Sequence, residues 1–180
     1  MLELGSNRIR KLENLDTFTQ LESLYAGKNK ISKLENLDAL VNLQVLSMQS
    51  NRLLRIENLS MLVQLDQLYL SNNGLENIEG LEALVNLTTL DLAANRIKRI
   101  TNVSHLVNLQ EFWFNDNQLA TWEDIDQLKP LKKLETVYLE RNPIWHDATH
   151  QSKQDPNYRR KIMLALPWLR QIDATYTNTK

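Results

Sequence analysis

The sequence predicts an α/β repeat solenoid, a horseshoe with a parallel sheet on its concave side and short helices on its convex side. Three observations predict it: an asparagine that recurs every 22 residues, a period-two pair of apolar residues before each asparagine, and apolar residues spaced by three after it. Period two is typical of a strand, and spacing by three suits tight helical turns. One repeat cannot bury its own apolar face, so the repeats must stack.

Six asparagines hold the 22-residue spacing and a seventh follows after 25 residues: Asn7, Asn29, Asn51, Asn73, Asn95, Asn117 and Asn142. The surrounding pattern, L-x-x-L-x-L-x-x-N-x-I, resembles the leucine-rich repeat. An amide both donates and accepts, so each anchor asparagine is expected to satisfy backbone groups that the turn leaves unpaired. A second polar series lies seven residues further on and indicates another turn: Asn14, Asn36, Asn58, Gly80 and Asn102.

The two ends of the chain differ from the central repeats. Residues 1–144 are expected to form the repeats, the first of them truncated, and residues 145–180 an insertion and a C-terminal cap. In the cap, Asp155 is a candidate helix N-cap, with Pro156 at the first helical position. One helix face and two returning residues are expected to cover the last repeat: Tyr158, Ile162, Met163, Leu166, then Leu169 and Ile172.

Composition excludes several classes of protein. A chain of 180 residues with 24% charged residues and a net charge of −1 is an ordinary single domain that gives no reason to expect nucleic acid as a partner. No apolar run approaches about 18 residues, so no membrane is expected. Cysteine is absent and glycine totals four, which removes thiol nucleophiles and phosphate-binding loops. His146 and His150 have a zinc-protease spacing but no third ligand, so no metal, cofactor or catalytic residue is predicted.

The stretch Glu111–Asn117, EFWFNDN, raises the question of binding. If Phe112 and Phe114 enter the core, Trp113 must face outward, four positions before its anchor asparagine. The same position in the successive repeats holds Glu3, Tyr25, Ser47, Tyr69, Asp91, Trp113 and Tyr138, with Glu111, Asn115 and Glu140 beside it. Aromatic anchors among acids favour a partner with basic residues, although aromatics also stack along sheets without binding anything.

A competing surface is the basic ridge, formed by residues one and four positions after the anchors: Arg8, Lys30, Arg52 and Arg96, then Lys11, Lys33, Arg55 and Arg99. Such a ridge could contact nucleic acid or an acidic protein, or could simply be a solvated rim.

The stretches LGSNRI, LAANRIKRI, EFWFNDN, LETVYLERNP and YRRKIMLALPWLRQIDAT closely resemble the leucine-rich-repeat regulatory subunit of type-1 serine/threonine protein phosphatase. The resemblance implies a non-enzymatic, monomeric regulator, nuclear and cytoplasmic, that acts in mitosis and in phosphatase maturation. It implies binding of the catalytic subunit through the concave face, with inhibitor-3 as a further partner. With the outward row, the predicted partner-binding residues are Glu3, Tyr25, Tyr69, Asp91, Glu111, Trp113, Tyr138 and Glu140. The alternative is an adaptor of another complex, such as a spliceosomal ribonucleoprotein scaffold.

Overall fold

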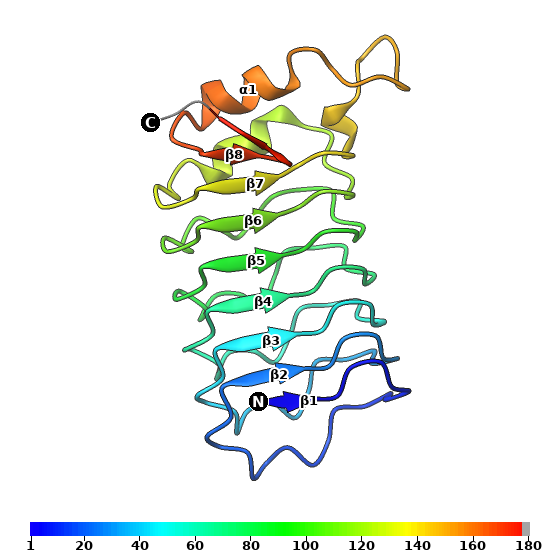
Figure 1. Ribbon diagram of the computed structural model, residues 1–180, viewed down its shortest axis with the longest axis vertical. Helices are drawn as coiled ribbons and strands as arrows, with labels where there is room; N and C mark the ends of the chain where they lie inside the picture. Colours follow the sequence, from blue (N-terminus) through cyan, green and yellow to red (C-terminus); the bar gives the residue numbers. More distant parts are fainter. Residues whose placement is uncertain (178–180) are drawn as a thin grey trace.

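A computed structural model of the chain describes residues 1–177, so the last three residues of the predicted cap lie outside the described part. The described residues form a coil whose turns stack along one axis, with each turn contributing one strand (Figure 1). Neighbouring strands follow the order of the chain, and all pair in parallel except the last two. The predicted repeat solenoid with a parallel concave sheet is therefore confirmed.

The strands are β1 (Leu2–Glu3), β2 (Ser23–Tyr25), β3 (Val45–Ser47), β4 (Gln67–Tyr69), β5 (Thr89–Asp91), β6 (Glu111–Trp113), β7 (Thr136–Tyr138), β8 (Gln171–Ile172) and β9 (Thr175–Tyr176). The helices are the 3-10 helices η1 (Trp122–Leu128) and η2 (Pro143–Trp145) and the α-helix α1 (Tyr158–Ala165).

The core is a column of identical layers. The central residue of each full-length strand points inward and is fully buried: Leu24, Leu46, Leu68, Leu90, Phe112 and Val137. Each is paired in register with its counterpart in the next strand. Parallel pairing without a register shift keeps every inward position over the next, so the apolar column stays continuous through the stack.

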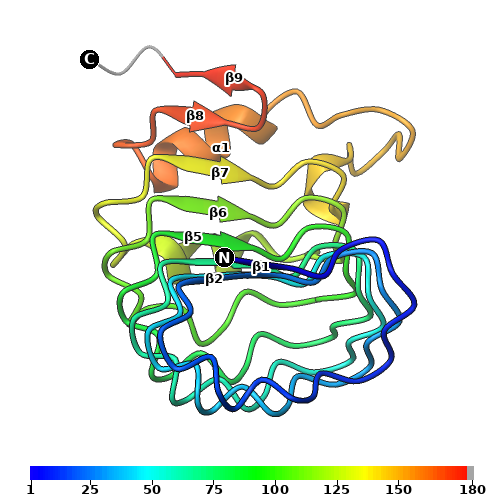
Figure 2. The same ribbon diagram turned by 60° about the horizontal axis from the view of Figure 1, so that its bottom comes forward.

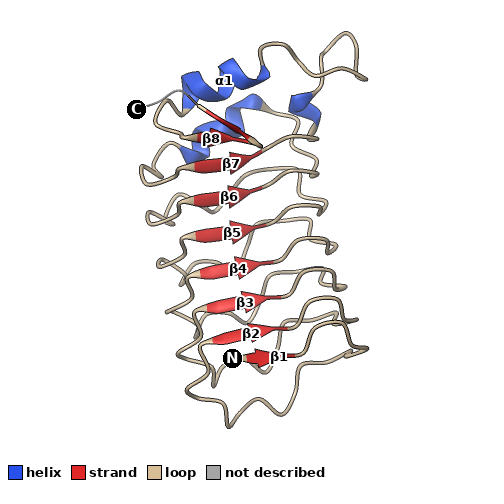
Figure 3. Ribbon diagram, in the orientation of Figure 1, coloured by secondary structure: helices blue, strands red, loops and turns tan. Residues whose placement is uncertain are grey.

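Helices are fewer than predicted on the wall opposite the sheet (Figures 2 and 3). In most repeats that wall consists of two consecutive turns, such as Leu106 N–H to Val103 O and Leu109 N–H to Leu106 O. A 22-residue coil is too short for a helix there, whereas the 25-residue repeat before Asn142 has room for η1. Within residues 1–177, no helix has the length and apolar character needed to cross a membrane.

The anchor asparagines connect successive repeats. Asn95, for example, donates from Nδ2 to the carbonyls of Leu70 (3.1 Å), Leu92 (3.0 Å) and Ala93 (3.2 Å), and its Oδ1 accepts the Leu75 N–H (3.1 Å). Asn29, Asn117 and Asn142 repeat the same bonds between repeats. Asn7 is exposed and bonds only Leu4 and Gly5 within its own turn.

The residues of the second polar series lie in turns, as predicted. Asn14, Asn36, Asn58, Gly80 and Asn102 all have positive φ angles, between 56° and 71°. Asparagine tolerates this region better than other non-glycine residues because its amide can bond locally. Here the amide of Asn102 donates to Ile78 O at 2.8 Å in the preceding repeat, so the series also ties neighbouring turns together.

The C-terminal cap closes the column, although its helix starts later than expected. Asp155 is not the N-cap of α1; its Oδ1 accepts the Asn157 N–H (2.8 Å) in a turn, and the helix begins at Tyr158. Tyr158, Ile162, Leu166, Leu169 and Ile172 are buried as predicted. Met163 is 38% exposed and does not belong to the buried face, because it lies one residue beyond Ile162 around the helix.

Candidate protein-binding face

The outward strand positions gather on the concave face of the sheet. In β6, Phe112 and Phe114 are fully buried, with their rings stacked 5.5 Å apart, and Trp113 between them projects to the opposite side. Trp113 is directly paired with Asp91 of β5 and Tyr138 of β7. The alternation of the strand therefore accounts for the tryptophan that faces water.

The outward ring of Trp113 packs against two other outward aromatic rings. The Trp113 ring centroid lies 6.0 Å from that of Tyr69 and 6.2 Å from that of Tyr138, with tilted and edge-on geometry. Two intra-strand bonds fix the rings: Trp113 Nε1 donates to Glu111 Oε2 (3.1 Å), and Tyr69 OH donates to Gln67 Oε1 (2.7 Å). We call Tyr69, Trp113 and Tyr138 the aromatic trio. A preset arrangement of rings loses little side-chain freedom on binding.

Asp91 lies between the strands that carry Tyr69 and Trp113, and it is only 6% exposed. Burial raises the pKa of its carboxyl group, while hydrogen bonds from the Ala93 N–H (3.0 Å) and the Ser71 hydroxyl oppose the rise. Burial, and then the charge of Asp91, also raises the pKa of Tyr69. The carboxyl group of Asp91 is thus held by the backbone and Ser71 beside the rings rather than standing free in solvent.

The remaining predicted residues divide into two groups. One hollow of about 430 Å³ is lined by four of the predicted residues, Asp91, Trp113, Tyr138 and Glu140. Its other lining residues are Ser71, Ala93, Asn115 and Arg141. Glu3 and Tyr25 line a smaller hollow of about 200 Å³ at the other end of the sheet, next to Gly27 and Gln49. The structure therefore brings together the residues of β4 to β7 and keeps those of β1 and β2 separate.

The cap also reaches the concave face, which the sequence did not reveal. Gln171 of β8 donates from Nε2 to Tyr138 OH (2.9 Å), and Asp173 Oδ2 accepts the hydroxyl of the buried Tyr158 (2.8 Å). Asp173 Oδ1 accepts the N–H groups of Leu139 and Glu140. The signal for this extra strand was the spacing of Leu169, Ile172 and Ala174, which follows the L-x-x-L-x-L pattern of the repeats.

The basic ridge separates into two rows with different partners. The inner row consists of Lys11, Lys33, Arg55 and Arg99. Each of these cations forms a salt bridge to a carboxylate of the next repeat: Glu35, Glu57, Glu79 and Asp124, respectively. The Arg99–Asp124 pair is bidentate, at 2.7 and 2.8 Å, and these bonds hold the pKa of Asp124 below its usual range. Within residues 1–177, the outer row of Arg8, Lys30, Arg52 and Arg96 forms no such pair.

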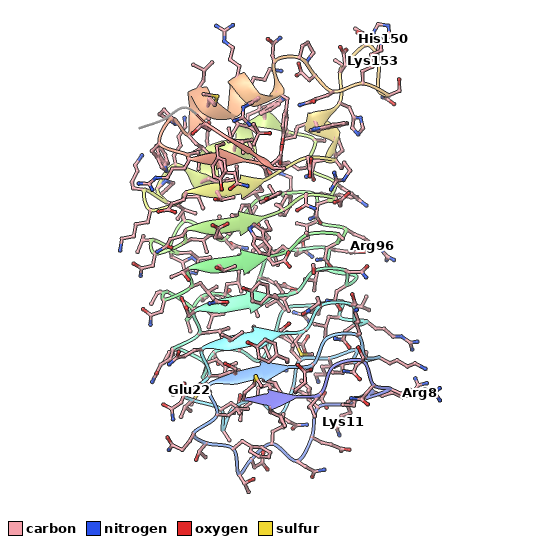
Figure 4. All side chains as sticks on the ribbon, in the orientation of Figure 1. Arg8, Lys11, Glu22, Arg96, His150 and Lys153 are labelled. Carbon is pink, nitrogen blue, oxygen red and sulfur yellow. The ribbon has the colours of Figure 1, made fainter. Side chains whose placement is uncertain are left out.

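The insertion between η2 and α1 projects from the end of the stack, where His150 and Lys153 lie at its tip (Figure 4). His146 pairs with Gln154 in an isolated antiparallel bridge. Asp147 Oδ1 accepts the N–H groups of Thr149 (2.7 Å) and His150 (3.2 Å), so this carboxylate organises the loop. No group of three or more potential metal ligands is found in the described part of the chain.

A sequence model of the leucine-rich-repeat family matches residues 55–180, well over half of the chain. The chain belongs to the leucine-rich-repeat family. Mouse (Mus musculus) protein phosphatase 1 regulatory subunit 7 is 66% identical over 50 residues, which make up 28% of this chain and 12% of that protein. This leucine-rich-repeat chain therefore matches only about an eighth of the length of its curated relatives.

Two solved structures confirm the fold. A leucine-rich-repeat protein of Leptospira interrogans superimposes with a TM-score of 0.81 and 24% identity, covering 94% of this chain and 42% of that one. A chain of the Drosophila melanogaster SNF/U2A′ complex gives a TM-score of 0.59 and 30% identity, covering 87% of this leucine-rich-repeat chain and 74% of that chain.

Proposed function

We propose that this protein is a non-enzymatic regulatory subunit that binds the catalytic subunit of type-1 protein phosphatase through its concave face. The observation that carries the proposal is the aromatic trio on the sheet, flanked by Glu111 and Glu140. Folding requires the inward residues of these strands but not the outward ones. The high local identity to a protein named as a regulatory subunit of this phosphatase supports the same partner.

The chemistry of the face fits a partner with basic residues. Half-buried aromatic rings lose their remaining water when a partner covers them, and such residues dominate the binding energy of many interfaces. Glu111 and Glu140 stand beside the rings, where they would attract Lys or Arg side chains and steer the encounter. Glu3 and Tyr25, at the other end, would provide a second contact on the same sheet.

The finer parts of the proposal follow the phosphatase-regulator resemblance. The regulator would act in the nucleus and cytoplasm, in mitosis and phosphatase maturation, with inhibitor-3 as a further partner. Residues 1–144 would provide the binding repeats, and residues 145–180 the insertion and cap. The extra bond from Gln171 to Tyr138 supports a role for the cap in holding one anchor ring in place.

A second candidate is an adaptor of another complex. The likeness to a chain of the SNF/U2A′ complex supports it, because that chain shares 30% of aligned residues. Such an adaptor would use the basic ridge rather than the aromatic trio, and its binding to a nucleic-acid partner would fall steeply with salt.

The test is a titration of the purified phosphatase catalytic subunit against this chain and its variants. Trp113→Ala and Tyr138→Ala should each weaken binding by about 2 kcal/mol or more, roughly 30-fold, if the rings are anchors. Phe18→Ala is the control, because Phe18 is a 41% exposed aromatic in the turns opposite the sheet. Circular dichroism should remain native in all variants. Equal affinity of parent and both concave-face variants would refute the proposal.

A further inference from the structure

The edge of the sheet where the strands end carries a line of cations that the fold leaves without partners. We call it the basic edge: Arg8, Arg10, Lys28, Lys30, Arg52, Arg96 and Lys98, which lie one position before, or one or three positions after, the anchor asparagines. Within residues 1–177, none of the seven forms a salt bridge. The inner row next to it is paired throughout, so the two rows differ in a way that their sequence spacing did not predict.

The charge of the basic edge is concentrated. Among the same positions of the first five repeats only one carboxylate occurs, Glu76, against seven cations. The whole chain has a net charge of −1, so the other surfaces carry the compensating negative charge. Figure 4 shows Arg8 and Arg96 on the edge where the strands end, with Glu22 on the opposite edge. A field of this kind attracts an anionic partner to one side of the molecule.

The basic edge is a track along the stack, interrupted at the fourth repeat, where Asn72, Gly74 and Glu76 occupy these positions. Neighbouring strands are separated by about 4.8 Å, so the four steps from Arg8 to Arg96 cover roughly 19 Å, the length of about six extended residues. At the end near Arg96 the track opens into a hollow of about 400 Å³. Arg96, Lys98 and Arg99 line it with Asn77 and Gln118, whose amides can donate to an anionic group, and with Thr101 and the carboxylate of Glu76.

We propose that the basic edge binds an extended acidic segment of a partner protein, rich in Asp and Glu, at a site separate from the concave face. Arginine and lysine donors in a row suit carboxylates on a flexible chain. A single-stranded nucleic acid would also require rings on which bases stack, and none of the edge positions in the first five repeats is aromatic. The aromatic trio projects from the sheet itself, so both surfaces can be occupied at once.

Fluorescence anisotropy with the whole chain tests this inference without any phosphatase. The probes are a labelled oligo-glutamate peptide of about ten residues, an oligo-glutamine peptide of the same length and a single-stranded RNA oligonucleotide. The glutamate peptide should bind most tightly, and its affinity should fall as salt is raised. Equal binding of the two peptides at low salt, or tighter binding of the RNA, would overturn the proposal.

Two matched double variants locate the site. Arg52→Gln with Arg96→Gln removes two charges from the basic edge, and Arg160→Gln with Arg170→Gln removes two exposed charges from the cap. The first should weaken glutamate-peptide binding about tenfold or more, and the second by less than about threefold. Equal losses would show a nonspecific effect of net charge and refute the site. Trp113→Ala should leave peptide affinity unchanged, and a matching loss in that variant would place the peptide on the concave face instead.

Discussion

Replacing Asn95 by alanine tests how the repeats are held together. Asn95 is 8% exposed and makes four hydrogen bonds, three as a donor to carbonyls and one as an acceptor of the Leu75 N–H. Two of these bonds reach into the preceding repeat, at Leu70 and Leu75. Alanine removes all four and adds no polar atom in their place.

The four partners are not equally affected. Each carbonyl keeps another donor: Asn73 Nδ2 for Leu70, Asn117 Nδ2 for Leu92 and the Asn72 N–H for Ala93. The Leu75 N–H has no second acceptor among the described residues, and its side chain is fully buried. The main cost is therefore one orphaned buried donor, about 1–3 kcal/mol, and we expect a loss near 2 kcal/mol in the free energy of unfolding.

Urea unfolding followed by circular dichroism measures the loss, with the slope against urea compared between variants so that midpoints can be converted to free energies. Asn7→Ala is the matched control, because Asn7 is exposed and bonds only carbonyls of its own turn. Its cost should stay below about 0.5 kcal/mol. A midpoint for Asn95→Ala equal to that of the parent or of the Asn7 control would refute the reasoning.

Three further changes have definite expected outcomes. Gly80→Ala should lower the free energy of unfolding by about 1–3 kcal/mol, because φ is +71° and the new Cβ would clash with Ile56 O; an unchanged urea midpoint would contradict this. Asp124→Asn should destabilise the fold at neutral pH. Because Arg99 lowers the folded-state pKa of Asp124, the deficit should shrink as pH falls from the unfolded value of about 3.9 through the folded one, and a pH-independent deficit would argue against the ion pair. Asp91→Asn should raise the midpoint at neutral pH, since burial raises the pKa of this carboxyl and penalises its charged form. The gain should vanish toward acid, where both side chains are neutral, and a loss of stability at neutral pH would contradict the role given to burial.

Period and register made most of the fold predictable. The recurrence of Asn fixed where each strand ends, and the L-x-L pair fixed which side chains enter the core, so Phe112 and Phe114 could be separated from Trp113 before any coordinates were considered. This works because the strand pairing and core contacts of a solenoid lie between neighbouring repeats, where the local pattern specifies them.

What the pattern could not specify depends on contacts between outward side chains or on repeat length. The contact of Tyr69 with Trp113 and the burial of Asp91 between their strands depend on side-chain conformations that spacing does not fix. The cations of the inner row lie four positions after their anchor asparagines, and the glutamates that pair with them lie six positions after the anchor of the next repeat. Only the stacked structure shows that these two positions come into contact. Helices opposite the sheet were overestimated because spacing by three fits single turns as well as a continuous helix.

Each coil contains residues that stacking requires and residues that stacking does not require, and the two sets occupy different positions. Inward leucines, anchor asparagines and positive-φ turns are repeated because every interface between coils needs the same contacts. The outward strand positions lie outside the apolar column, so the core does not require Trp113 or Tyr138 there. Burial raises the pKa of the Asp91 carboxyl group, so we expect its charged form to lower stability at neutral pH. Under the proposed function, Asp91→Asn is expected to combine a loss of partner affinity with a gain in stability.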